Sequence, residues 1–163
     1  MKFERPYLRL RKDLSEPIYP LILNENYRLK PFEPPRDIAP ARQVLNESYQ
    51  SGEGSIQCAE DWWSNISNDP EFDLKLLFCV VDGAGNLVGV AHSWTSGFLK
   101  DLAVSPEHRR FGIGRFLVNE TFRKSREFGL TTLDLKVVAD NQSGAIALYR
   151  AMGMVEVFED KEN

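Results

Sequence analysis

An arginine- and glycine-rich segment, Val104-Ser-Pro-Glu-His-Arg-Arg-Phe-Gly-Ile-Gly-Arg115, has the residue types of an anion-binding site. It leads from an apolar strand into an amphipathic helix. Gly112 and Gly114 have no Cβ, so a bulky anion can approach the backbone closely. The first amides of the helix lack intrahelical partners and carry the positive end of its dipole, which predicts phosphate binding. Three side chains add charge and bidentate hydrogen bonds: Arg109, Arg110 and Arg115.

Two common phosphate-binding patterns do not fit this segment. A P-loop needs Lys followed by Ser or Thr after its second glycine, and Arg115-Phe116 stands there. A dinucleotide fingerprint needs a third glycine where the chain has Leu117. Taken alone, the pattern is also compatible with an ordinary turn from a strand to a helix.

The sequence pattern Arg-x-x-Gly-x-Gly, from Arg109 to Gly114, resembles the pyrophosphate loop of the GNAT N-acetyltransferases, which binds the diphosphate of acetyl-CoA. The resemblance implies that acetyl-CoA is the co-substrate. It assigns coenzyme binding to Arg109, Arg110, Phe111, Gly112, Ile113, Gly114 and Arg115.

A second motif, Asn141-Gln-Ser-Gly-Ala-Ile-Ala-Leu-Tyr149, resembles the family's Asn-x-x-Ala-x-x-Leu-Tyr, with Gly144 as an extra residue. The resemblance makes Tyr149 the general acid that protonates the leaving coenzyme A thiolate. A phenol with a pKa of about 10 is protonated at neutral pH. The residues alone also allow an aromatic packed at a helix end. Asn141 is either the N-cap of its helix or a ligand of the coenzyme arm.

The strand before the loop resembles the family's fourth strand, and residues 130–136 resemble its fifth. In that family the two strands splay apart, which implies unpaired backbone groups that bind the pantetheine arm. One amide then faces the thioester oxygen. The residues concerned are Leu102, Ala103 and Val104, whose side chains also fit an ordinary core.

The acceptor side has no evident general base. Many family members carry Glu or His on the fourth strand where this chain has Lys100 and Phe98. His92 and Glu53 are candidates, with a water chain or an α-amine substrate as alternatives. Asp101 lies on the other face of the strand if the strand is regular. Candidate acceptor contacts are Trp94, Phe98, Lys100 and residues 50–55; Lys100 and Lys136 favour a substrate with a carboxylate if they face the cleft.

Composition narrows the class of protein. A chain of 163 residues suits one domain. Its net charge of −4 argues against a duplex nucleic-acid binder, and no apolar run approaches the length of a membrane span. Two cysteines and an N-terminus without a signal-peptide core predict a cytoplasmic protein. We assign no metal site.

Hydrophobic periodicity predicts an α/β domain with a mixed central sheet. The expected elements are strand 27–32, helices 36–49 and 56–66, strands 75–81, 86–94 and 97–104, helix 112–128, strand 132–138, helix 141–152 and strand 154–158. This order, β-α-α-β-β-β-α-β-α-β, is that of the GNAT fold. The crossover helix implies that the strands on either side of it run parallel. Residues 1–25 are expected to form an arm or edge strand that can dock on a second subunit of a homodimer, and residues 26–163 are expected to form the N-acetyltransferase domain.

The sequence therefore predicts an N-acetyltransferase that moves an acetyl group from acetyl-CoA to a primary amine of a small molecule or peptide. Two features resemble the branch of mycothiol synthase-like acetyltransferases. They are the pattern Asn-x-Ser-Gly-Ala, and Trp62 or Trp63 ahead of residues 69–73. The alternative is an acyl-CoA-binding module without turnover, because the fourth strand lacks the usual carboxylate.

Overall fold

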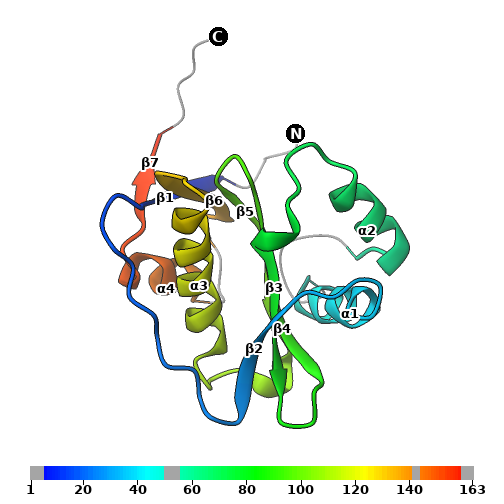
Figure 1. Ribbon diagram of the computed structural model, residues 1–163. Coiled ribbons are helices and arrows are strands. Elements are labelled where there is room, and N and C mark those ends of the chain that lie inside the picture. The colour runs from blue at the N-terminus through cyan, green and yellow to red at the C-terminus, as the bar shows by residue number, and fades with distance from the viewer. Residues whose placement is uncertain (1–5, 50–55, 141–143, 159–163) are drawn as a thin grey trace.

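The computed structural model describes residues 6–49, 56–140 and 144–158. In these residues a seven-stranded mixed sheet has the order β2-β3-β4-β5-β6-β1-β7 (Figure 1). The strands are β1 Tyr7–Asp13, β2 Tyr27–Pro31, β3 Leu77–Asp82, β4 Leu87–Trp94, β5 Phe98–Val104, β6 Thr132–Val138 and β7 Val155–Val157. The α-helices are α1 Ile38–Tyr49, α2 Ala59–Ser67, α3 Ile113–Glu127 and α4 Ala145–Ala151, with short 3₁₀ turns at Leu74–Leu76 and Pro106–His108. The predicted α/β class and mixed sheet are confirmed.

Helices cover both faces of the sheet, α1 and α2 on one and α3 and α4 on the other (Figure 1). On the first face, Leu45 and Trp62 pack against Val90 of β4. On the second, Leu117 of α3 packs over Ala91 of the same strand. The helix comes very close to the sheet at Gly89, where a Cβ would lie 3.0 Å from the Leu117 side chain. This close packing holds the start of α3, and the loop before it, firmly against the sheet.

The sheet opens between β5 and β6. The two strands run parallel, as the crossover helix predicts, but they pair only at Phe98 and Asp134. In contrast, β4 and β5 pair at six positions. Beyond that single pairing the two strands diverge, so the splay expected between them is present.

The first strand departs from expectation. β1 lies between β6 and β7 and is antiparallel to both, so the expected arm or edge strand is wrong for Tyr7–Asp13. Its alternation explains the placement: Leu10 is fully buried in the core, and the next residue faces the other side of the sheet. There, Arg9 and Arg11 both donate through Nε to Asp134 of β6 at 2.7 Å. The strand therefore completes the chain's own sheet.

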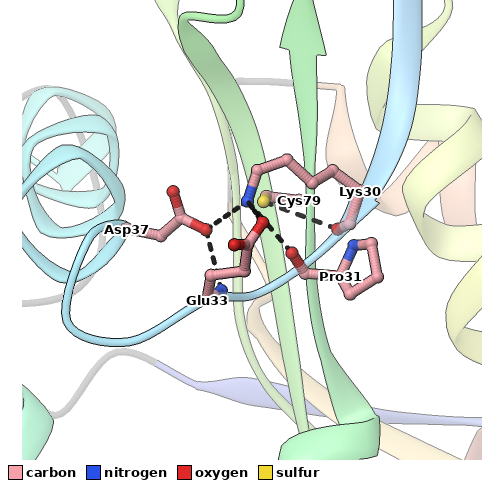
Figure 2. A network of polar contacts seen from close by, with 5 residues as sticks. All are labelled: Lys30, Pro31, Glu33, Asp37 and Cys79. Carbon is pink, nitrogen blue, oxygen red and sulfur yellow. Dashed lines mark hydrogen bonds and ion pairs between the residues drawn. The ribbon is translucent and has the colours of Figure 1, made fainter.

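A buried ion pair joins β2 to the beginning of α1 (Figure 2). The Lys30 ammonium pairs with the Asp37 carboxylate, lies 3.2 Å from a carboxylate oxygen of Glu33, and donates to the Pro31 carbonyl at 3.1 Å. Cys79 of β3 lies beside this network, and burial raises the pKa of its thiol to about 12. The network therefore holds the first turn of α1 at the sheet.

Candidate functional site

A cleft of about 740 Å³ opens where β5 and β6 diverge. Its walls come from β5, β6, the end of α1, the loop before α3, the start of α3, and α4. The charged or ionisable basic side chains at its surface are Lys100, His108, Arg109, Arg110, Arg115 and Lys136. Among the described residues, no Asp or Glu lines it. A chain of net charge −4 thus presents a basic cleft, which suits an anionic ligand.

The loop before α3 passes through the left-handed region of the backbone at two residues. Gly112 occupies the N-cap position with φ of 80°, in the left-handed region that favours glycine, and no side chain caps the helix. Arg110 also has a positive φ, 70°. Tyr27 of β2 anchors the loop, since its hydroxyl lies 2.9 Å from His108 Nδ1. The uncapped first amides of α3 therefore lie at the cleft.

Most of the predicted coenzyme residues line this cleft: Leu102, Ala103, Val104, Arg109, Arg110, Gly112, Ile113, Gly114 and Arg115. Phe111 is not among the lining residues. Its ring is 48% exposed and packs against Tyr27, with 5.9 Å between the ring centroids. Asn141 lies outside the described residues.

Tyr149 lies on α4, is half-buried, and lines the cleft with Ala145 and Leu148. The helix begins at Ala145, and Gly144 is its N-cap with φ of 83°. The N-cap in the described residues is therefore Gly144, and Asn141, offered either as the cap or as a coenzyme ligand, lies outside them. The extra residue of the motif takes the left-handed conformation at the cap, which glycine adopts at little cost.

Of the predicted acceptor contacts, Lys100 lines the cleft and two aromatic residues do not. Trp94 packs edge-on to His92, with 4.7 Å between ring centroids. Phe98 lies under the guanidinium of Arg9 at 5.6 Å. Lys136 lines the cleft, whereas residues 50–55, including Glu53, lie outside the described residues.

A β-bulge at Lys100 changes which way β5 presents its side chains. His92 pairs with Asp101 but the next residue of β4 pairs with Leu99, so Lys100 is an extra residue on β5. Leu99 consequently packs on the α3 face, in a cluster with Val118. Asp101, two residues on, faces the opposite side. The strand is not regular, and the placement of Asp101 expected from alternation does not apply.

Asp101 is 3% exposed and is held by three donors. The Tyr49 hydroxyl donates to its Oδ1 at 2.7 Å, and the Trp62 Nε1 donates to its Oδ2 at 3.2 Å. The Lys100 ammonium lies 3.2 Å from the same Oδ2. Burial alone would raise the pKa of this carboxyl, but the Lys100 charge and the two hydrogen bonds outweigh burial and lower it. Asp101 is therefore an ionised group directly behind the cleft wall.

Tyr49, at the end of α1, lines the cleft and is a residue that sequence reasoning missed. Its only sequence signal was its place on the apolar side of the helix, which indicated core packing. His92 was a candidate to reach the cleft, and that expectation is wrong. It is fully buried, and burial lowers the pKa of its imidazole to about 4. Within the described part of the chain its ring nitrogens have no hydrogen-bond partner.

The described residues hold neither a membrane-spanning helix nor a cluster of metal-ligating side chains. No helix among the described residues combines the length and apolarity needed to cross a bilayer. In that same part of the chain, no group of three His, Cys, Asp or Glu side chains is placed to hold a metal ion.

The chain resembles known proteins in both sequence and structure. It is 28% identical to the mycothiol acetyltransferase of Thermobispora bispora, an alignment that covers 91% of this chain and 53% of that protein. A GCN5-related N-acetyltransferase from Sphaerobacter thermophilus superposes with a TM-score of 0.80 at 23% identity, covering 93% of this chain and 48% of that one. The chain thus spans about half the length of these relatives.

A second similar structure is nearer in length. The ribosomal-protein-S18-alanine N-acetyltransferase of Escherichia coli superposes with a TM-score of 0.65 at 24% identity, over 81% of this chain and 79% of that chain. The sequence profile of the acetyltransferase (GNAT) family matches residues 38–154, a span that includes the loop at 109–115, the splayed strands and α4. The chain belongs to the GNAT family of acetyltransferases.

Proposed function

We propose that this chain transfers an acetyl group from acetyl-CoA to the primary amine of a small molecule or peptide. The observation that carries the proposal is that one cleft joins the arginine-glycine loop, the unpaired part of β5 and Tyr149. These three parts are separate in the sequence, and each supplies a different requirement of acyl transfer. The loop supplies anion binding, the strand supplies backbone hydrogen bonds, and the phenol supplies a proton.

On the donor side, the diphosphate of acetyl-CoA binds to the uncapped amides at the start of α3 and to the arginines of the loop. The pantetheine arm lies in the gap between β5 and β6. There the backbone groups of Leu102 to Val104 bond to it much as an added strand would. An amide of the same strand faces the thioester oxygen and stabilises the negative charge that develops on it.

Tyr149 then acts as general acid. The amine nitrogen attacks the thioester carbon, a C–N bond forms, and the C–S bond breaks. The departing sulfur takes the phenolic proton, and the amine loses one of its own to solvent. Phenol and thiol have comparable acidities, so this transfer needs little driving force.

The acceptor is proposed to carry a carboxylate near its amine. Lys100 and Lys136 both line the cleft and would attract such a group. An α-amine, with a pKa of about 8, is partly neutral at physiological pH, whereas a lysine amine near 10.4 is mostly charged. Both considerations favour amino acids or peptide N-termini over polyamines.

The test is thiol release from acetyl-CoA over a panel of amino acids, short peptides and polyamines. Acceptor-dependent release, largest with the amino acids or peptides, is the expected result. A preference for polyamines would remove the carboxylate from the proposal. If calorimetry showed tight coenzyme binding and no amine on the panel stimulated release, the transferase proposal would fail.

A further inference from the structure

Tyr49 and Tyr149 bring two phenols to one cleft from different helices. Tyr49 is the last residue of α1, and Tyr149 lies on α4. Both line the cleft, and Tyr149 is among the groups that influence the pKa of Tyr49. The proposed function uses Tyr149 as an acid and leaves Tyr49 without a role.

The hydrogen bond from Tyr49 to Asp101 fixes which part of the phenol faces the cleft. A phenol has one O–H donor and two acceptor lone pairs. The O–H of Tyr49 is directed at Asp101, a buried carboxylate that can only accept. The phenolic oxygen is therefore left with lone pairs for any ligand in the cleft. Burial and the Asp101 charge also raise the pKa of Tyr49, so the proton stays in this bond.

No carboxylate lines the described part of this wall, and its lysine and arginine side chains can only donate. Lys100, Lys136 and the loop arginines are donors that have no lone pair to offer. They suit phosphate and carboxylate groups, but none of them can receive a hydrogen bond from an amine. Asp101 itself does not line the cleft, and it is linked to the cleft through the two lining residues bonded to it, Tyr49 and Lys100.

We propose that the oxygen of Tyr49 accepts a hydrogen bond from an N–H of the attacking amine. Asp101 is the positioning residue, because it accepts the Tyr49 O–H and so leaves the phenolic lone pairs for the amine. The inference rests on the amine acetylation proposed above. A primary amine that donates one N–H to Tyr49 is held with its lone pair free for the thioester carbon. No proton is transferred in this binding step.

Asp101→Asn should reverse the direction of the hydrogen bond between residue 101 and Tyr49 while the tyrosine stays in place. Trp62 Nε1 and Lys100 both donate at Oδ2, so the amide oxygen of the asparagine stays there. Its NH₂ group then faces Tyr49 and donates to the phenolic oxygen. The Tyr49 O–H then points into the cleft at the N–H of the amine, so two donors face each other and no hydrogen bond forms between them.

The experiment is a double-mutant cycle of Tyr49→Phe and Asp101→Asn on the full chain. It measures kcat/KM for the amine, the Kd of acetyl-CoA and the Tm. We expect each single variant to lower kcat/KM for the amine about 10- to 100-fold, the range for a hydrogen bond to a polar or charged group. The Kd of acetyl-CoA stays unchanged. The double variant is no worse than Tyr49→Phe alone, because Asp101 acts on the amine through Tyr49.

Several outcomes would overturn the inference. If Asp101→Asn lowers kcat/KM equally with and without Tyr49→Phe, Asp101 is a structural residue only. If Tyr49→Phe leaves the amine's kcat/KM unchanged in a chain that turns over, Tyr49 does not bind the amine, and the transfer itself stands. A wild-type chain without acceptor-dependent release would end both proposals.

Controls separate these effects from loss of folding. Tyr49→Phe keeps the ring and its contact with Arg42, so it decides the role of Tyr49 even if Asp101→Asn does not fold. The matched control is Tyr19→Phe, a 77% exposed tyrosine that does not line the cleft. This variant is expected to retain wild-type kinetics.

Discussion

The proposed donor and acceptor sides of the cleft are built in different ways. The donor side is one continuous segment, in which β5, the arginine-glycine loop and the start of α3 follow one another in the chain. The acceptor side joins Tyr49 of α1 and Lys100 of β5 through Asp101. As proposed, the donor side would work through backbone amides and local charge, whereas the acceptor side would depend on side chains that only the fold brings together. Substitutions should therefore separate coenzyme binding from acceptor binding.

The largest expected effect is on the rate of the chemical step, while neither binding step should change. Tyr149→Phe removes the proposed acid, so kcat should fall about 10²- to 10⁴-fold, the range for lost acid catalysis. The Kd of acetyl-CoA, measured by calorimetry, should not change, because the ring and its packing remain. An unchanged kcat would take Tyr149 out of the mechanism.

The next largest effect is on stability, through the buried ion pair that holds α1, the helix carrying Tyr49, against the sheet. Lys30→Met leaves the Asp37 carboxylate buried without its cation, which should lower the free energy of unfolding by about 3–5 kcal/mol. Asp37→Asn should cost less, since Glu33 stays beside the ammonium. Urea unfolding measures both, with Lys75→Met at an exposed position as control. A loss no larger than that of the control would contradict the structural role of this pair.

A pH effect should follow from His92, which lies behind the acceptor side. Its folded pKa of about 4 lies below its usual value of 6.5, so between these pH values the unfolded chain binds more protons. The free energy of unfolding should therefore fall as pH drops from about 6.5 to 4, by up to about 3 kcal/mol. The depressed pKa of Asp101 adds a further loss only at more acidic pH.

The measurement is denaturant unfolding at several pH values in wild type and in His92→Gln. The variant should have a flatter profile between pH about 6.5 and 5, because it lacks the titrating imidazole. Equal slopes in the two proteins would mean that His92 is not the group responsible.

The smallest expected effect tests the donor side. Arg115→Ala should raise the Kd of acetyl-CoA about tenfold, the value of one charge-assisted hydrogen bond, with a smaller change at high salt. The KM of the amine should be unaffected. Arg28→Ala, an exposed position on β2 away from the cleft, is the matched control. If the amine's KM rose instead, the division into two sides would be wrong.

The sequence alone predicted the elements and gathered the candidate donor-side residues, most of which line the cleft, because both depend on local features. Hydrophobic periodicity identifies strands and helices, and the glycines at 112 and 114 leave room for an anion to approach the backbone. Tyr149 was also identified from a local motif, and the structure places it in the same cleft as that loop. Local patterns could not reveal the partner of each strand, so β1 was expected at an edge or in an arm when it lies inside the sheet.

The acceptor side was decided only by the tertiary structure. One extra residue, Lys100, reverses the alternation of β5, and this turns Asp101 toward Tyr49 and Trp62. Strand alternation has a period of two residues, so a single-residue bulge moves each later side chain to the other face, and spacing alone does not reveal it. The contact between Tyr49 and Asp101 spans 52 residues of sequence. Such contacts come from the packing of helices on a sheet, and the local pattern of residues does not encode them.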